Sequence, residues 1–310
     1  MEQALTATPN VANVPSLASG CMLVEFGFSC WGTVKKDNAA TKAIAQSTGA
    51  STDSVEGRKD IMASAKLKAI RTHGANHRNW IHYKLTLPWS DAGLRLLPTK
   101  RHPEYVKQMT AAEQKYWKLV KEFLDEYEFD IAQRMQQSQE LGTLFNHDDY
   151  PPVDQLKSKF GWRCVMTNVP ESGDIRLDLP AEALDLIRQD YDKFYADQIQ
   201  RAANDVWQRT RKSLTTLVEN LSPKEGEFKA NGEQKYGKMN TNVFETARGM
   251  VDMLRDYNLN GDTQMTAIAD QLENVLYGTS KDMFTNSESL RLDKAAEIKQ
   301  VIDNLPSLDI

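Results

Sequence analysis

Two long stretches with a helical pattern of apolar residues constrain this chain more than any other feature. After Pro103 there is no proline before residue 151 and no glycine before Gly142. Apolar side chains recur there at spacings of three and four residues, which is the repeat of one helix face. A second stretch covers about 40 residues after Pro180 and would form a rod of about 60 Å. The chain is therefore expected to be mainly helical.

Strand-like composition is confined to short segments. MLVEFGFSCWGTV (22–34) is rich in aromatic and β-branched residues, and WRCVMTNV (162–169) and DIRLDL (174–179) flank the turn sequence PESG. We expect one small antiparallel β-element made from these three segments. Because the long helices flank the hairpin in sequence, they are expected to pack antiparallel as a stalk, with the hairpin inserted between them. The predicted class is α+β, mainly α.

A third helix is expected to begin near Ser54 and to run towards Lys84, where Pro88 ends it. The following segment, 86–103, contains three prolines and a glycine, which is too many for regular structure. Its Trp89 and leucines nevertheless predict that it packs onto the core.

Composition and turn residues divide the chain into four expected regions. These are a flexible N-terminal arm (1–20), the stalk with its small sheet (21–222), a polar glycine-containing linker (223–238), and a C-terminal helical subdomain (239–310). The last region should contain three helices, at about 240–257, 263–277 and 287–304.

The composition is that of a soluble globular protein. Of the 310 residues, 26% are charged and 40% are hydrophobic, and no run approaches the roughly 18 apolar residues of a membrane span. The N-terminus lacks the basic and apolar regions of a signal peptide. The three cysteines are an odd number without a CxxC motif, which argues against a disulfide framework or a zinc site. We expect a cytoplasmic protein that does not enter a membrane.

Charge is segregated along the chain. Residues 56–115 carry 12 basic and 5 acidic side chains, a net charge of +7, whereas residues 239–310 carry 6 and 12, a net charge of −6. The basic block can attract a polyanion, or it can pair with the acidic third of the same chain or of a neighbouring subunit. The second interpretation requires no further partner and is favoured.

Motifs for chemistry are missing from the sequence. It contains no GxxxxGK[ST] phosphate loop, no GxGxxG and no GxSxG. Cys30 and Cys164 fall in expected strands, where a small buried thiol is common. We therefore expect neither a cofactor nor an enzymatic activity.

The best calcium-like pattern is DYNLNGDTQMTA (256–267). It provides Asp256, Asn258 and Asn260 at the first, third and fifth positions, but its twelfth position is Ala267 in place of the bidentate Glu. We expect a polar turn in which Asp262 or the residue after it caps the next helix.

Two histidine patterns also resemble metal sites. His73 and His77 have the i, i+4 spacing of two ligands on one helix face, but no third ligand is evident. The run His147-Asp148-Asp149 lies between a helix and a proline turn, where carboxylates are common without a metal. No metal site is predicted.

The most suggestive surface lies between residues 71 and 105. Cations that hold phosphates alternate there with aromatic side chains such as Trp80, Tyr83 and Tyr105, on which bases could stack. The alternative is that Trp80 and Trp89 anchor the core and the cations are solvated. The candidate nucleic-acid-binding residues are Arg71, Arg78, Lys84, Trp89, Arg95, Lys100 and Arg101.

Four segments resemble a family of unknown function found in tailed phages and some bacteria. They are TLPWSDAGLRLLP (86–98), LFNHDDYPPVDQLKSKF (144–160), PESGDIRLDLP (170–180) and DVWQR (205–209), within a resemblance that covers roughly residues 20–260. Members tend to be encoded beside a MoxR-type AAA+ ATPase and a cobaltochelatase-like protein with a von Willebrand A domain. The resemblance implies a component of an ATPase-driven module and implies no catalytic residues.

The expected function is therefore non-enzymatic. We expect a phage protein of the host bacterial cytoplasm that forms homo-oligomers through its long helices and acts as a self-assembling component or adaptor of such an ATPase module. The alternative is a single-stranded nucleic-acid-binding protein of phage recombination or replication that uses the basic aromatic 71–105 region.

Overall fold

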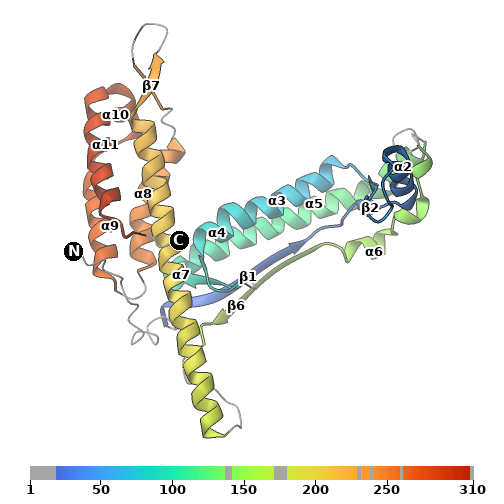
Figure 1. The fold of residues 1–310 in the computed structure, drawn as a ribbon, viewed down its shortest axis with the longest axis horizontal. Coiled ribbons are helices and arrows are strands. Elements are labelled where there is room, and N and C mark those ends of the chain that lie inside the picture. Colours follow the sequence, from blue (N-terminus) through green and yellow to red (C-terminus); the bar gives the residue numbers. More distant parts are fainter. Residues whose placement is uncertain are drawn as a thin grey trace. The chain divides into compact units, whose positions relative to one another are not determined.

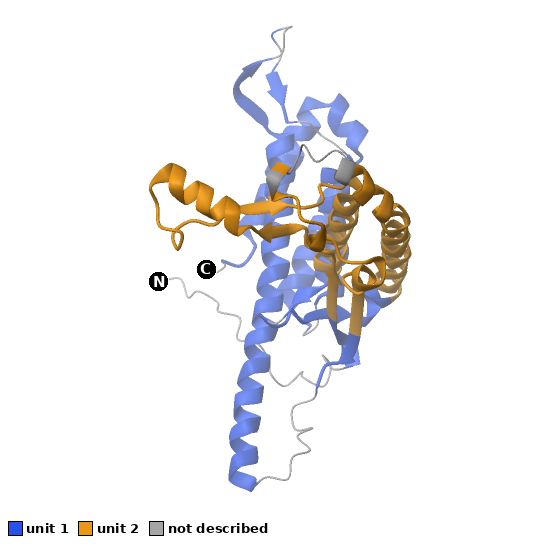
Figure 2. Cartoon of the chain, turned by 90° about the vertical axis from the view of Figure 1, so that its right-hand side faces the viewer, with its two compact units in different colours: residues 1–24, 86–102, 166–310 blue, residues 25–85, 103–165 orange. Residues whose placement is uncertain are grey.

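The computed structural model describes residues 19–91, 93–136, 142–170, 180–228, 232, 234–237, 241–258 and 261–307. Within these residues the chain is mainly helical with small antiparallel sheets, which confirms the predicted fold class (Figure 1). It divides into two compact units (Figure 2). Unit 1 comprises residues 1–24, 86–102 and 166–310, and unit 2 comprises residues 25–85 and 103–165.

Unit 2 is built on a helical hairpin. One arm consists of helix α3, a π-helical turn η2 and a short helix α4, and the other is the long helix α5. Lys66 forms an ion pair with Glu126 near one end of the hairpin, and His82 contacts Tyr105 near the other, so the two arms run antiparallel. The elements are α3 (Ala65–His77), η2 (Arg78–His82), α4 (Tyr83–Leu85) and α5 (His102–Gln136).

The far end of unit 2 is made of small elements. Strands β2 and β3 pair antiparallel, and Lys35 lies opposite Lys59. The elements are β2 (Val34–Lys36), α2 (Asn38–Thr48), β3 (Arg58–Asp60), η4 (Gly142–Leu144), η5 (His147–Asp149) and α6 (Val153–Lys157). The core of the unit runs along the inner face of α5, where Tyr116, Phe123 and Tyr127 are buried.

The helix expected from Ser54 begins ten residues later. Ser64 is its N-cap and accepts a hydrogen bond from the Leu67 amide, while Arg58–Asp60 form strand β3. The reason is that β3 completes a ladder with β2, and this tertiary pairing outweighs local helix propensity. The helical arm ends at Leu85, as predicted.

A four-stranded sheet has the order β4-β5-β1-β6, with bounds β1 (Cys21–Ser29), β4 (Leu87–Pro88), β5 (Arg95–Pro98) and β6 (Gly161–Asn168). Strands β1 and β6 were expected. The β4–β5 hairpin corrects the expectation that 86–103 is irregular, because its prolines lie at strand ends, where no ladder hydrogen bond is lost. Gly93, with φ of +97°, makes the tight turn between the two strands.

Unit 1 is a helical bundle around the second long helix. Its helices are α7 (Ala181–Leu221), α8 (Thr241–Asp256), α9 (Thr263–Leu276), α10 (Lys281–Asn286) and α11 (Glu288–Asp303). Their apolar faces share one core that includes Trp207, Leu214, Leu254, Leu272 and Ile298. The positions of α8, α9 and α11 agree with the prediction, whereas the short α10 was not expected.

The expected division of the chain is wrong in three respects. The C-terminal helices are not a separate subdomain, because their buried faces are completed by α7. The two long helices do not form one stalk within a unit, since α5 belongs to unit 2 and α7 to unit 1. The expected linker contains an antiparallel pair, β7 (Pro223–Phe228) and β8 (Gln234–Tyr236), in which Glu227 forms an ion pair with Lys235.

Parts of two predictions lie outside the described residues, namely the second hairpin strand at 174–179 and most of the N-terminal arm. Within the part of the chain that the structure describes, no helix is long and apolar enough to cross a membrane.

Candidate functional site

The seven candidate nucleic-acid-binding residues do not lie in one unit. Unit 2 contains Arg71, Arg78 and Lys84, and unit 1 contains Trp89, Arg95, Lys100 and Arg101.

In unit 1, three of these residues hold the 86–102 segment in place. Trp89 is buried, with its ring edge-on to Tyr195 at a centroid distance of 5.2 Å. Arg95 donates to the side chain and the carbonyl of Thr86 at 2.7 and 3.0 Å. Arg101 Nε lies 2.9 Å from Asp256 Oδ2, and Lys100 is exposed. Trp89 therefore anchors this segment in the core, as the alternative interpretation expected.

A buried polar cluster joins this segment to α7. Arg209 Nη2 donates to the Thr86 carbonyl at 3.1 Å and lies 2.5 Å from Asp205 Oδ2. Burial raises the pKa of Asp205, although Arg209 and Arg95 act in the opposite direction. Nearby, burial raises the pKa of Tyr257 to about 12, and its hydroxyl has no hydrogen-bond partner among the described residues. Arg209 is half-buried in this cluster, whereas Lys212, one turn further along α7, is exposed.

In unit 2, two of the candidates are also engaged. Arg71 donates to the Trp31 carbonyl at 2.7 Å and to Thr33 Oγ1 at 3.2 Å. The Arg78 guanidinium lies 4.8 Å from the centre of the Phe28 ring, within the range of a cation–π interaction. Lys84 is exposed.

Trp80 is the residue that the structure singles out. It lies in the π-helical turn η2 and is 70% exposed, and Tyr83 in the following turn is 42% exposed. The turn follows from burial, because His77 and His82 are both buried although five residues separate them. An α-helix repeats its buried face every three or four residues, so the extra residue of a π-turn restores the face and directs Trp80 outwards. Trp80 is therefore not the core anchor that Trp89 is.

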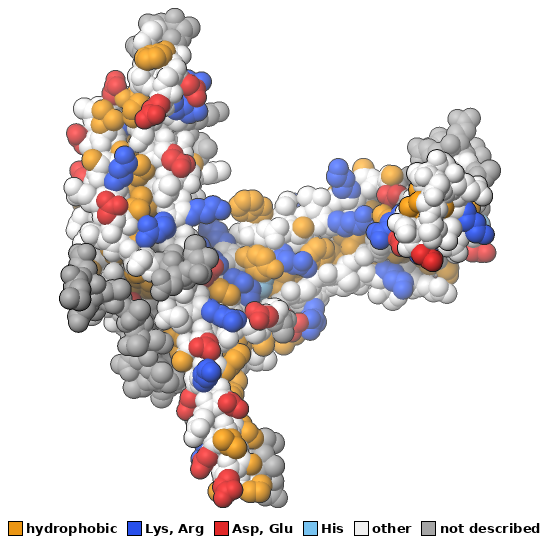
Figure 3. All heavy atoms as spheres, viewed as in Figure 1, with side chains coloured by type: hydrophobic (Ala, Val, Ile, Leu, Met, Phe, Trp, Pro, Cys, Tyr) orange, Lys and Arg blue, Asp and Glu red, His pale blue; other side chains and the backbone are white. Residues whose placement is uncertain are grey.

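The surface around Trp80 draws on both arms of the hairpin. Since His73 contacts Ala112 and His82 contacts Tyr105, Trp80 lies at the level of Val106 and Lys107 on α5. Figure 3 shows hydrophobic side chains beside Lys and Arg over α4 and the adjoining part of α5. We call this surface the aromatic platform and define it as Trp80, Tyr83, Lys84, Val106 and Lys107, all of which are exposed.

A layer of histidines and aromatic rings supports the platform from within. His82 Nδ1 lies 2.8 Å from the Tyr105 hydroxyl, and Phe26 contacts both His77 and Trp162, with ring centroids 5.2 and 4.7 Å apart. Burial, aided by the nearby His73, lowers the pKa of His77 to about 4. His77 is thus a neutral core residue at pH 7 that supports the platform.

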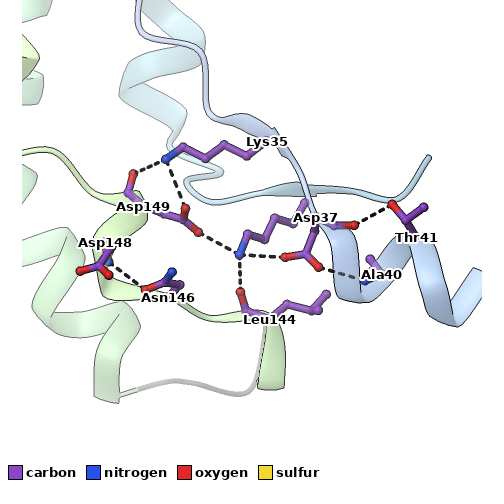
Figure 4. Close-up of polar contacts among 9 residues, drawn as sticks. Lys35, Asp37, Ala40, Thr41, Leu144, Asn146, Asp148 and Asp149 are labelled. Atoms are coloured by element: carbon purple, nitrogen blue, oxygen red, sulfur yellow. Dashed lines mark hydrogen bonds and ion pairs between the residues drawn. The ribbon is translucent and has the colours of Figure 1, made fainter. Parts of the chain in front are cut away.

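The far end of unit 2 holds an ionic cluster (Figure 4). Lys59 Nζ, on a side chain only 8% exposed, lies 3.0 Å from Asp37 Oδ2 and 2.8 Å from Asp149 Oδ2, and donates to the Leu144 carbonyl at 2.7 Å. Lys35 adds a second cation 3.2 Å from Asp149.

The charges of this cluster favour one another. The hydrogen bond that Lys59 donates to Asp149 raises the pKa of Lys59, and Asp37 adds to the effect. Burial alone would raise the pKa of Asp149, but Lys59 and Lys35 outweigh it and the net pKa is lowered. A lysine that acts as a base or a nucleophile needs a lowered pKa, so this cluster is suited to joining β2, β3 and η5 and not to catalysis.

The metal-like patterns have structural roles where they are described. Asp262 caps α9 and accepts hydrogen bonds from Gln264 and Met265, as expected, while Asn260 lies outside the described residues. Asp149 pairs with two lysines. No group of three or more potential metal ligands occurs among the described residues.

An open hollow lies in unit 1 between α10 and α11. Its volume is about 580 Å³, and it is lined by Asp282 and Asp293, by the apolar Met283 and Leu290, and by small polar side chains. Among the described residues, neither Lys nor Arg lines it. The hollow suits a partner that carries an apolar group and positive charge.

Comparisons with known proteins gave no match: neither a family model, nor a curated protein, nor a solved structure resembles the chain significantly.

Sequence reasoning named Trp80 among the aromatic side chains of the 71–105 surface but left it out of the candidate binding residues, and it did not predict the hollow. The five-residue spacing of His77 and His82 is a signal for the π-turn, but it can be read only once both are known to be buried. The hollow depends on how α10 packs against α11, and no sequence motif predicts it.

Proposed function

We propose that this chain is a non-enzymatic protein that acts by binding macromolecules and assembles with copies of itself. The observation that carries the proposal is the exposed Trp80, held outward by a π-helical turn on a rigid helical hairpin. Tryptophan is enriched at the centres of protein interfaces, and rigid presentation lowers the entropic cost of binding. Single π-helical turns within α-helices are frequently found at functional sites.

The resemblance to a phage and bacterial family extends this proposal. It supports a role in the host bacterial cytoplasm as a component or adaptor of a module that contains a MoxR-type AAA+ ATPase and a von Willebrand A protein. The segments that carry the resemblance include the 86–98 hairpin and Asp205–Arg209, which together form the buried cluster of unit 1. They are suited to maintaining the fold that presents the binding surfaces.

Mass photometry of the purified protein at low salt tests the proposal. We expect a discrete multimer, and we expect Trp80→Ala to shift it towards the monomer. Tyr277→Ala, which removes an equally exposed aromatic side chain from unit 1, is the matched control and should leave the mass unchanged. A wild-type protein that remains monomeric across the accessible concentrations would exclude self-assembly.

A second candidate function is single-stranded nucleic-acid binding. Two exposed aromatic rings, Trp80 and Tyr83, occur on the platform together with Lys84 and Lys107, a combination that can stack bases and hold phosphates. Anisotropy of a labelled oligonucleotide should then fall steeply with salt, and Lys84→Ala with Lys107→Ala should reduce the salt slope by about 1.4, which is about 0.7 for each lysine on a single strand. Binding that ignores both salt and these changes would remove this candidate.

A further inference from the structure

The platform of unit 2 and the hollow of unit 1 have opposite chemistry. The platform presents two aromatic rings and Val106 with two lysines. The hollow presents Met283 and Leu290 between two aspartates. Every copy of the chain carries both surfaces, so each copy offers a partner for the other.

We propose that the aromatic platform of one copy docks into the α10–α11 hollow of a second copy. This inference rests on the proposed self-assembly and names the two surfaces that perform it. Trp80 would enter the hollow against Met283 and Leu290, while Lys84 and Lys107 would face Asp282 and Asp293.

Charge complementarity selects a second copy as the occupant. The hollow has two carboxylates and no cation in its lining, and the platform has two ammonium groups. The same asymmetry extends through the chain, since residues 56–115 carry +7 and residues 239–310 carry −6. Patches of opposite charge steer the diffusional encounter of two copies. Pairings that bring like charges together are disfavoured by repulsion.

The contact is heterologous, because different surfaces of the two copies meet. Such contacts repeat head to tail, and they produce a ring if the rotation closes or a filament if it does not. A two-fold symmetric dimer satisfies the same pairing only where each platform meets the other copy's hollow at the same time, and it stops at two copies. Species larger than a dimer therefore indicate the head-to-tail series, and a dimer that grows no further indicates the reciprocal pairing.

Two variants test the pairing. A platform variant carries Trp80→Ala and Lys107→Glu, and a hollow variant carries Asp282→Lys and Asp293→Lys. Each is expected to weaken self-association about 30-fold, which corresponds to about 2 kcal/mol. All changed side chains are exposed, and circular dichroism checks that each variant folds. Asp252→Lys, an exposed change on α8, is the matched charge control.

Mixing the two variants gives the decisive measurement by mass photometry. The platform variant keeps an intact hollow and the hollow variant keeps an intact platform, so the mixture should form a one-to-one dimer and grow no further. A mixture that stays monomeric, or variants that assemble like the wild type, would overturn this inference.

The failures can be told apart. A wild type that assembles while both variants also assemble refutes the pairing and leaves the proposed function standing. A wild type that never assembles refutes both. A platform variant that still assembles but loses oligonucleotide binding would refute the pairing and assign the platform to nucleic acid.

Discussion

Two buried charge clusters, one in each unit, join distant segments in different ways. In unit 2, Lys59 lies between Asp37 and Asp149, and the cations outweigh burial so that the pKa of Asp149 is lowered. In unit 1, Asp205 lies 2.5 Å from Arg209, yet burial prevails and the pKa of Asp205 is raised. The first cluster is fully compensated and the second only in part.

The difference teaches how much each cluster should contribute to stability. When one charged side chain of a compensated group is removed, the charges that it neutralised remain buried without a counter-charge. This is strongly destabilising. A carboxylate whose ionised form is already disfavoured stabilises the fold less, so its neutralisation should change the free energy of unfolding less. The predictions below test this contrast, in order of decreasing effect.

Removal of the Lys59 ammonium should have the largest effect. We expect Lys59→Ala to lower the free energy of unfolding of unit 2 by about 3 kcal/mol, because two carboxylates then face each other without the cation. Urea denaturation with hydrogen exchange of unit 2 peptides measures this. Lys42→Ala, at an exposed position of α2, should change stability by less than about 0.5 kcal/mol. A loss below about 1 kcal/mol for Lys59→Ala would show that the cluster is not a clamp.

His77 sharpens the comparison, since it is buried in unit 2 without a counter-charge. Its pKa is lowered to about 4, so the unfolded chain binds a proton first as the pH falls below about 6.5. The stability from neutral His77 is complete above pH 6.5 and is lost between pH 6.5 and 4, by about 3 kcal/mol in all. His77→Phe should flatten this part of the stability curve, whereas His147→Phe, at an exposed site, should retain it.

Two glycines extend the comparison from charge to packing. A Cβ at Gly74 in α3 would lie 2.5 Å from the Phe28 ring, whereas a Cβ at Gly249 in α8 would meet nothing within 4 Å. We expect Gly74→Ala to destabilise unit 2 by about 1–3 kcal/mol through overpacking. Gly249→Ala should stabilise unit 1 by about 0.8 kcal/mol through helix propensity. Thermal unfolding of both variants checks the opposite signs.

Neutralising Asp205 should have the smallest effect. Asp205→Asn is expected to change stability at neutral pH by about 1 kcal/mol or less, because burial already disfavours the ionised carboxylate. The raised pKa also means that unit 1 gains stability as the pH falls from that pKa towards the ordinary value of 3.8, and the Asn variant should lose this gain. Asp197→Asn on the exposed face of α7 is the control. A loss as large as that of Lys59→Ala would erase the contrast between the clusters.

The sequence predicted the helices better than it predicted the units. The apolar spacing and caps placed α5, α7, α8 and α9 correctly, because these signals are local. The start of α3 and the β4–β5 hairpin were missed, because strand pairing with β2 and β1 decided them. Among the candidate site residues, Arg71, Arg95 and Arg101 proved to hold the fold, since their acceptors lie between 9 and 155 residues away along the chain.

What the sequence by itself determined is the set of helices, the segregation of charge and the missing motifs for chemistry, all of which depend on residues close together along the chain. The tertiary structure decided which side chains stay at the surface. Trp80 and Trp89 both look like core anchors in the sequence, yet burial of His77 and His82 directs Trp80 outwards while Tyr195 covers Trp89. Exposure is set by the neighbours that distant segments supply, so it could be known only from the folded chain.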